Sequence, residues 1–353
     1  PLKGLLLRLR ENEDWRQTPG IASARYGHVE SQPLSSQLTD LDSLPMPDRD
    51  LYFRYRFLAR FPWKKFSTGR GCPHSCSFCW NPEIRKNFGS SAGFVRRKSP
   101  ERAVEEVSWV KSRYPLRRVH FSDDLFTMDS DWLEKFSAVY SSRVRLPFTC
   151  NSTATALNPR VVDALKEAGC HGVAMGLETG NERIRTQVLN KRVGDGSIRT
   201  AARLLKQAKI ELTTFNMVGS PTERPKDVYR TIAMNREIRA DHIRVTRVLP
   251  MPHSKLAQRL AQERADGESS SIRQEAEMDR LVPLFRLAVR HAWLEPILRQ
   301  IATLPCGPLL RPLAYLGALE EKRINGLRLI EGLRCFRHTG LPSSRTANYV
   351  TLV

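Results

Sequence analysis

The feature that most constrains the fold is a regular alternation of short apolar strands and amphipathic helices between about residues 64 and 250. The helix boundaries carry ordinary signals, such as Ser99 and Pro100 at one start and Gly169 at one end. Strands that alternate with helices of this length form repeated βαβ units and a parallel sheet. The predicted strands are 65–68, 118–121, 147–151, 172–177, 211–218 and 242–248.

Six such strand–helix units fit into this span, whereas a full eight-unit barrel takes about 250 residues. We therefore predict an α/β fold, namely a partial (β/α)6 barrel of the TIM type, followed by a helical C-terminal extension. Parallel sheets of this kind bind ligands at the carboxyl ends of their strands. Polar motifs follow the predicted strands at that edge and predict one active site there: a cysteine loop, Asp123-Asp124, Asn151, Glu178 and Asn216.

The cysteine loop places Cys72, Cys76 and Cys79 within eight positions, spaced Cys-x3-Cys-x2-Cys, on a Gly/Pro-rich segment. Thiolates this close together can converge on one metal centre. A structural zinc or an electron-transfer cluster takes four protein ligands, whereas three cysteines around a four-iron cluster leave one iron open. A zinc site would need a second ligand pair nearby, and His74 is the one close candidate. A disulfide framework fits poorly with an odd cysteine count in a large chain.

The spacing, the Gly-Cys-Pro start and the aromatic Phe78 before the third cysteine resemble the signature of the radical SAM enzymes. The resemblance implies a [4Fe-4S] cluster on Cys72, Cys76 and Cys79, with the open iron binding the amino and carboxylate groups of S-adenosylmethionine (SAM). It also implies reductive cleavage of SAM to a 5′-deoxyadenosyl radical that abstracts hydrogen from a small-molecule substrate. A flavodoxin or ferredoxin would supply the electron.

Further residues match this family and are predicted to bind SAM. Gly176-Leu177-Glu178 resembles the Gly-x-Glu motif, whose carboxylate binds the SAM amino group, and a charged donor of this kind favours a fixed carboxylate acceptor. The resemblance implies that Lys191 faces the SAM carboxylate and that Phe78 and Asn216 also belong to the SAM site. Each residue also has an alternative without SAM: Glu178 could complement the dipole at a helix N-terminus, and Lys191 could be a solvated lysine on a helix surface.

Asp123 and Asp124 are the candidate catalytic residues. Adjacent acids at a strand end could bind a substrate cation or a ribose, or accept a proton, and the sequence does not divide these roles between them. The alternative is that one of them caps the next loop. Two positions depart from the family pattern, because Thr222 and His253 occur where glycine is usual.

Residues 1–50 are expected to be the tail of an upstream domain and a linker, because Pro1 is not an initiator. One helix is predicted at 2–10, followed by an extended path without a sheet. This order resembles the segment after the cobalamin-binding domain in cobalamin-dependent radical SAM proteins. It implies that cobalamin is bound mainly by a missing domain and that the reaction is a methylation or a related C–H functionalisation.

The remaining boundaries are a core at 51–255 and a helical extension at 256–353. In the extension, helices over 272–338 are expected to be interrupted by prolines that include Pro283, and Cys306 and Cys335 are expected to be buried as small apolar residues.

The net charge of +20 favours anionic partners, yet the charges are scattered, so nucleic acid is not the favoured partner. No apolar run approaches a membrane span, and reduced cysteines predict a cytoplasmic location. Two alternatives stay open. The first is a tRNA methylthiotransferase-type radical SAM enzyme, and the second is a non-catalytic iron–sulfur or zinc module of a larger complex.

Overall fold

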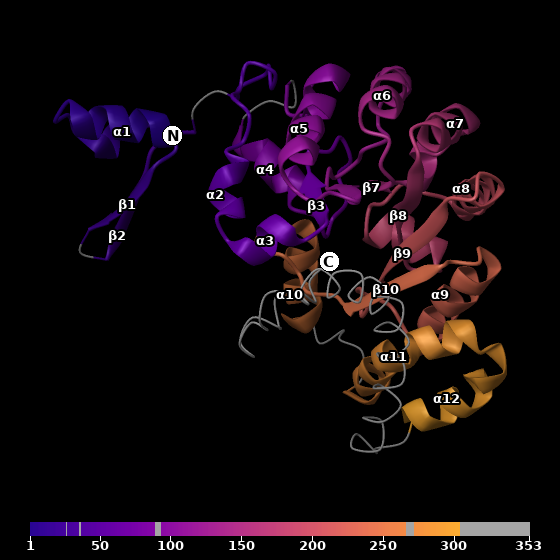
Figure 1. The fold of residues 1–353 in the computed structure, drawn as a ribbon. Coiled ribbons are helices and arrows are strands. Elements are labelled where there is room, and N and C mark those ends of the chain that lie inside the picture. The colour runs from indigo at the N-terminus through magenta and orange to yellow at the C-terminus, as the bar shows by residue number, and fades with distance from the viewer. Residues whose placement is uncertain (26, 35–36, 89–92, 266–271, 304–353) are drawn as a thin grey trace.

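The computed structural model describes residues 1–25, 27–34, 37–88, 93–265 and 272–303. Its centre is an open six-stranded sheet in the order β10-β9-β8-β7-β6-β3, and every neighbouring pair is parallel. This confirms the predicted partial (β/α)6 barrel (Figure 1). The strands are β3 Trp63–Phe66, β6 Arg118–Phe121, β7 Phe148–Ser152, β8 Cys170–Glu178, β9 Glu211–Val218 and β10 His242–Arg247.

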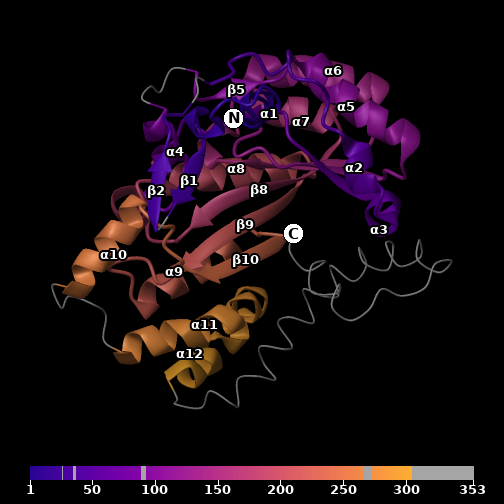
Figure 2. The same ribbon diagram turned by 90° about the vertical axis from the view of Figure 1, so that its left-hand side faces the viewer.

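Helices connect successive strands and cover one face of the sheet (Figures 1 and 2). They are α5 Pro100–Arg113, α6 Ser130–Arg143, α7 Pro159–Glu167, α8 Asp195–Gln207 and α9 Pro225–Glu237. Ser99 acts as the predicted cap, with its Oγ accepting the Arg102 N–H. At the start of α7, Asn158 Oδ1 accepts the Val161 N–H at 3.0 Å in the same way. Gly169 has a positive φ of 83°, which ends its helix in the left-handed conformation.

The core lies between the sheet and these helices. Side chains on the covered face of the sheet, such as Val119 and Phe121 on β6, are fully buried, whereas their neighbours on the opposite face are half-exposed. An aromatic cluster centres on Phe121, whose ring stacks on Phe126 with centroids 4.8 Å apart and meets Phe148 edge-on at 5.3 Å. Such pairs add about 0.5–1.5 kcal/mol each beyond burial.

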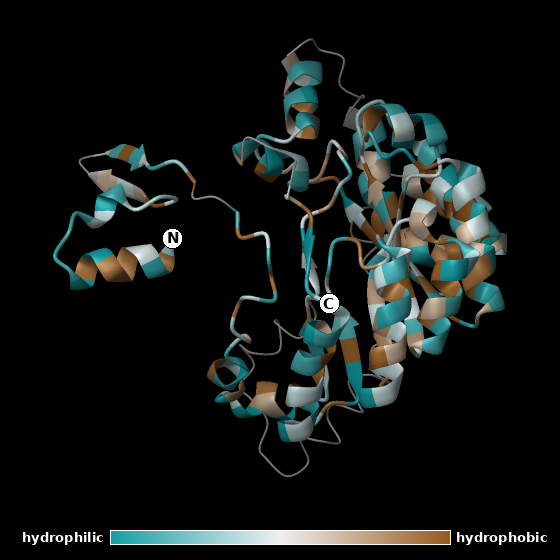
Figure 3. Cartoon of the chain, turned by 90° about the horizontal axis from the view of Figure 1, so that it is seen from above, coloured by the Kyte–Doolittle hydropathy of each residue, from teal (hydrophilic) through white to brown (hydrophobic). Residues whose placement is uncertain are grey.

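The N-terminal segment differs from its prediction. Helix α1 (Leu2–Arg10) forms as expected, but β1 (Ala22–Arg25) and β2 (His28–Ser31) pair as an antiparallel hairpin, so the expectation of no sheet here was wrong. Gly27, with a φ of 81°, permits the tight turn between the two strands. These elements stand away from the barrel and join it through an extended segment (Figure 3).

Short elements connect this segment and the first strand to the barrel. Helices α2 (Arg49–Phe53) and α3 (Arg56–Arg60) precede β3. Two short strands, β4 (Gly69–Arg70) and β5 (Arg96–Arg97), pair on either side of α4 (Asn81–Asn87), so the segment that contains the cysteines is closed into a loop.

The described part of the extension is helical, as predicted: α10 Lys255–Ala265, α11 Ile272–Arg290 and α12 Glu295–Thr303. An apolar cluster of Phe285 and Leu281 on α11 with Ile232 on α9 packs α11 onto the barrel. Pro283 lies inside α11 instead of interrupting it, which corrects the prediction, because this packing offsets the backbone hydrogen bond that proline cannot donate. Cys306, Cys335 and the expectations for 304–338 lie outside the described residues.

In the described ranges, no helix is both long and apolar enough to cross a membrane.

Candidate active site

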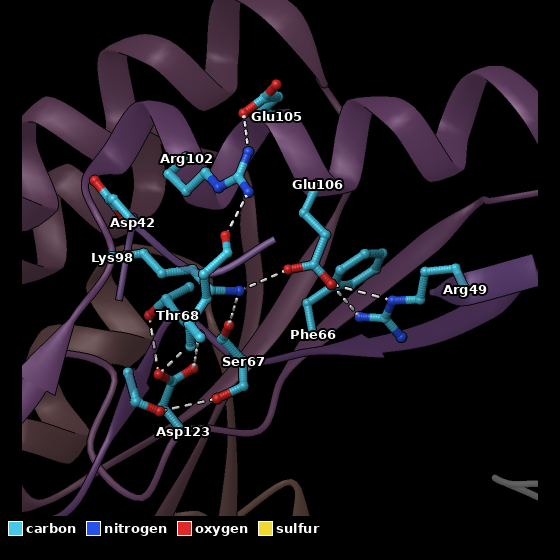
Figure 4. A network of polar contacts seen from close by, with 12 residues as sticks. Asp42, Arg49, Phe66, Ser67, Thr68, Lys98, Arg102, Glu105, Glu106 and Asp123 are labelled. Carbon is cyan, nitrogen blue, oxygen red and sulfur yellow. Dashed lines mark hydrogen bonds and ion pairs between the residues drawn. The ribbon is translucent and has the colours of Figure 1, made fainter. Parts of the chain in front are cut away.

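The cysteine loop begins where β3 ends, and a buried carboxylate anchors its first residue (Figure 4). Asp123, which follows β6, accepts hydrogen bonds from the Thr68 N–H at 3.0 Å and from Thr68 Oγ1 at 2.9 Å. Asn151 on β7 donates to the Asp123 carbonyl at 3.0 Å. Burial raises the pKa of Asp123, although the Thr68 bonds oppose the shift. Both Asp123 oxygens are engaged by the chain itself, so this residue fixes the start of the loop.

A second buried carboxylate holds the same region from α5. Glu106 accepts Arg49 Nε at 3.0 Å through one oxygen and Lys98 Nζ at 2.7 Å through the other. Lys98 also donates to the carbonyl of Ser67 at 3.1 Å, so the ion-pair network reaches the end of β3 (Figure 4). A paired and buried carboxylate of this kind is costly to disrupt, because either partner left alone would be an unpaired buried charge.

The three cysteines of the loop are half-buried and electrostatically coupled. Burial, with a smaller contribution from the charges of Cys79 and Cys72, raises the pKa of Cys76 to about 11. Burial also raises the pKa of Cys72, and the charge of Lys191 opposes the rise at both cysteines. No group of three or more His, Cys, Asp or Glu side chains within the described ranges is placed to hold a single metal ion.

The chemistry of the donor set is that of a cluster site. Soft thiolate ligands are those that iron–sulfur clusters take, and a bound cation would reverse the raised pKa values by stabilising the thiolate form.

Two distant segments clamp the loop at Ser77. Its N–H donates to the Leu189 carbonyl at 2.9 Å and its hydroxyl to the Val188 carbonyl at 2.9 Å, while its carbonyl accepts the Leu256 N–H of α10 at 3.0 Å. Phe78 packs beside this clamp in an apolar cluster with Leu189 and Leu256. The extension thus contacts the cysteine loop directly, which the sequence did not indicate because the bonds are made by backbone atoms.

Glu178 and Lys191 form an ion pair that faces the loop. Lys191 Nζ lies 2.8 Å from Glu178 Oε1. The charge of Lys191 acts to lower the pKa of Cys76, and the charge of Glu178 acts to raise it. Glu178 ends β8 at a bulge and has a positive φ of 64°, which turns its side chain back over Gly176. A Cβ at Gly176 would lie 2.2 Å from both Glu178 Oε1 and Lys191 Nζ, so a larger residue here would displace the charged ends of the pair.

A fully buried arginine holds the backbone around this pair. Arg185 lies in the π-helix η3 (Ile184–Val188) and pairs with Asp195. Its Nε donates to the Val193 carbonyl at 2.7 Å, and its Nη1 donates to the Thr179 carbonyl at 2.6 Å. It therefore ties the residue after Glu178 to the segment that carries Lys191. No motif in the sequence distinguishes Arg185 from the many exposed arginines.

The two adjacent acids occupy different environments. Asp123 is the buried anchor of Thr68, whereas Asp124 is exposed and accepts Asn81 Nδ2 at 3.1 Å. Asn81 also donates to Cys79 Sγ from its backbone N–H at 3.5 Å and from Nδ2 at 3.6 Å. The charge of Asp124 contributes to the raised pKa of Cys72. Asp124 is therefore the acid that faces the cysteines, a distinction that the sequence left open.

Asn216 is not brought together with the other predicted SAM residues. Its side chain is buried on the helix-covered face of β9, where Oδ1 accepts Asn235 Nδ2 of α9 at 2.8 Å and Nδ2 donates to the Arg244 carbonyl at 3.0 Å. These bonds occupy its amide in joining β9 to its neighbours.

Thr222 and His253, which occur where glycine is usual, both keep the backbone conformation that glycine favours. Thr222 has a φ of 62° and His253 a φ of 64°, both in the left-handed region that glycine adopts most easily. The loop shape that a glycine would allow is therefore retained at these positions, at some cost in local strain.

Comparisons with known proteins agree with this geometry. Residues 66–234 match the family model described as the radical SAM superfamily. An uncharacterised methyltransferase of Pyrococcus horikoshii is 27% identical over 263 residues, which cover 72% of this chain and 54% of that protein. The cobalamin-dependent radical SAM methyltransferase TokK of Streptomyces tokunonensis is 25% identical, over 62% of this chain and 33% of its own.

A solved structure shows the same fold. The cobalamin-dependent SAM radical enzyme OxsB, with aqua-cobalamin and SAM bound, superposes with a TM-score of 0.65 at 11% identity, over 93% of this chain and 58% of its own. The chain spans about a third to a half of the length of the curated relatives it matches. Residues 66–234 thus match the radical SAM superfamily, and the fold and the three-cysteine loop agree with that match.

Proposed function

We propose that this chain is the catalytic core of a cobalamin-dependent radical SAM methyltransferase. The observation that carries the proposal is the placement of Cys72, Cys76 and Cys79 at the carboxyl edge of the sheet, facing the Glu178–Lys191 ion pair. Three thiols are the protein ligands of a [4Fe-4S] cluster that keeps one iron open, and the ion pair stands beside that position.

The ion pair offers both halves of a binding site for the methionine end of SAM. That end carries an ammonium and a carboxylate on one carbon. Glu178 would accept the ammonium and Lys191 would bind the carboxylate, so an internal ion pair would be exchanged for two pairs with the ligand. Because Arg185 fixes the backbone on both sides, the two charged groups need little reorganisation to bind.

When bound, the cluster supplies the electron for cleavage of the SAM sulfonium, and cobalamin supplies a transferable methyl group. The chain's own contribution is to hold SAM against the cysteine loop and to exclude water through the clamp at Ser77. Relatives named as methyltransferases support methyl transfer, and cobalamin-dependent ones support the cofactor. We propose that a further domain binds most of the cobalamin, that the substrate is a small molecule, and that a flavodoxin or ferredoxin acts as reductant in the cytoplasm.

The tRNA methylthiotransferase alternative receives no support from the described extension, where residues 255–265 and 272–303 are helices with a short 3₁₀ turn rather than an RNA-binding barrel. The alternative of a non-catalytic module leaves the Glu178–Lys191 pair beside the cysteines without a use.

Iron content after anaerobic reconstitution tests the proposal. The unaltered chain should bind about four irons, and Cys76→Ala should lose most of them and the charge-transfer absorption of the cluster. Cys170→Ala, which changes a cysteine on β8 that is distant from the loop in sequence, is the control and should keep its iron. With dithionite and SAM, the loaded chain should release 5′-deoxyadenosine. A Cys76→Ala protein with full iron and an unchanged spectrum, or a loaded chain that never cleaves SAM, would contradict the proposal.

A further inference from the structure

The face of the sheet that the helices leave uncovered carries its own set of polar side chains. Strand residues alternate between the two faces, and the half-exposed or exposed members of β3, β6 and β7 on this uncovered face include Lys65, His120 and Thr149. We call this surface the inner face. The Glu178–Lys191 pair lies over Gly176, which also belongs to the inner face, so both features share one side of the sheet.

Lys65, His120 and Thr149 are neighbours in one row across three strands. The register pairs Lys65 with His120 and His120 with Thr149, so adjacent backbones in the row are about 4.8 Å apart. His120 Nδ1 lies 2.8 Å from Thr149 Oγ1. Lys65 makes no hydrogen bond or ion pair with the residues that the structure describes, although its charge acts on His120.

Burial and positive charges on both edge strands of the sheet lower the pKa of His120. Burial, followed by the charges of Lys65 on β3 and Arg244 on β10, lowers the pKa of His120 to about 4. His120 is therefore neutral at pH 7. The contact between Nδ1 and Thr149 Oγ1 uses one hydrogen of the pair, so either the ring Nε2–H or the Thr149 hydroxyl is left as a donor.

The charges on the inner face are predominantly positive. Among the strand residues of this face, the cations are Lys65, Arg118 and Arg244, and the carboxylates are Glu211 and Glu178, the second of which pairs with Lys191. Glu211 Oε2 is already contacted by His242 Nε2 at 3.1 Å and by His171 Nε2 at 3.4 Å. An excess of cations and donors over carboxylates favours an anionic ligand.

We propose that the inner face binds an oxyanion of the substrate, a carboxylate or a phosphate, through the Lys65 ammonium and the remaining donor of the His120–Thr149 pair. That the ligand is the substrate rests on the proposed function, whereas the oxyanion site rests on these side chains alone. In the strand register, the row of Lys65, His120 and Thr149 continues to Gly172 and Glu211. Gly176 is four residues nearer the carboxyl edge on β8, in a separate row with Phe215 and Arg244. A substrate held by its oxyanion would thus extend toward the carboxyl edge of the sheet, where SAM is proposed to bind.

The test uses the full chain with ¹⁵N-labelled histidine and follows the ring signals by NMR. Inorganic phosphate is titrated in one arm and acetate in the other, and His120→Gln identifies the His120 signals by their loss. We expect a saturable shift of the His120 ring nitrogens with at least one of the two anions, and the arm with the tighter binding identifies the oxyanion class.

Lys65→Met keeps the length of the side chain and removes its charge, so it should weaken anion binding at least tenfold. Lys135→Met, on the exposed side of α6, should leave the affinity within a factor of two. Circular dichroism checks that both variants fold. A shift that does not saturate, no shift at all, or equal affinity in folded Lys65→Met would overturn the inference. Because the titration uses neither SAM nor iron, its outcome is independent of the cluster experiment.

Discussion

At the scale of single residues, the arrangement around Glu178 links backbone geometry to ligand chemistry. A bulge and a positive φ turn its carboxylate back over Gly176 and against Lys191. The pair is almost fully buried, so each charge depends on the other or on a replacement from a ligand. A zwitterion satisfies both groups at once, which a simple cation or anion could not do.

Glu178→Gln should therefore weaken SAM binding without unfolding the chain. The loss of one charge-assisted hydrogen bond corresponds to about 1.5–3 kcal/mol, or roughly a 10- to 100-fold higher Kd by calorimetry. The iron content should be unchanged. Glu167→Gln, an exposed acid at the end of α7, serves as the matched control. Equal SAM affinity in the two variants would assign Glu178 a purely structural role.

Asn81 is expected to tune the potential of the cluster. Its side chain donates to Cys79 Sγ and stabilises negative charge there, which favours the reduced cluster. Asn81→Ala removes a bond of about 0.5–1.5 kcal/mol, which for a one-electron couple is about 20–65 mV toward more negative potential. Redox titration monitored by electron paramagnetic resonance measures this shift. Asn87→Ala, exposed on the same helix, should keep the original potential, and a positive or absent shift in Asn81→Ala would refute the role.

At the scale of elements, α10 acts as a support for the cysteine loop. Leu256, at its second position, is nearly fully buried against Ile184, Val188 and Leu189, and its N–H bonds the Ser77 carbonyl. Three segments distant in sequence thus meet at one point: the cysteine loop, the segment after β8 and the first turn of α10. The packing of the extension is coupled to the geometry of the site through this contact.

Leu256→Ala should destabilise the chain by about 2–4 kcal/mol in urea unfolding, because a buried leucine leaves a cavity. The variant should also release iron to a chelator faster than the unaltered chain, since the clamp on Ser77 loosens. Leu249→Ala removes a leucine that is 83% exposed and should change neither quantity. If iron release is unaffected while stability falls, α10 supports the fold but not the loop.

At the scale of the whole molecule, the described N-terminal segment offers little enclosing surface. Before residue 50 it comprises α1, a short 3₁₀ turn, a two-stranded hairpin and the start of α2, and α1 buries none of its residues. An isolated two-stranded hairpin is marginally stable in water. A large planar cofactor such as a corrinoid needs a broad concave surface to be held tightly.

We therefore expect this 353-residue chain to show no saturable hydroxocobalamin binding at micromolar concentration in equilibrium dialysis. The same preparation should bind SAM after reconstitution, which controls for folding. A longer protein that includes a cobalamin-type domain should bind both. Tight stoichiometric cobalamin binding by this chain alone would contradict the division of labour that we propose.

The sequence by itself determined the order and type of the barrel elements. Strands β6 and β9 match their predicted ranges, and the helix that begins after Ser99 is capped as predicted. The cysteine spacing likewise identified the family before any contact was known. These features are local: apolar periodicity, capping residues and motif spacing each act over a few residues, so the chain displays them directly.

The tertiary structure alone decided which side chains meet. It separated buried Asp123 from Asp124, turned Asn216 toward α9, brought Glu178 onto Lys191 and placed Leu256 against the cysteine loop. It also kept Pro283 within α11 and paired residues 22–25 with 28–31. Such outcomes depend on strand register, on a single bulge and on packing between segments far apart in sequence. One residue of register reverses the face of every side chain in a strand, and no local pattern carries that information.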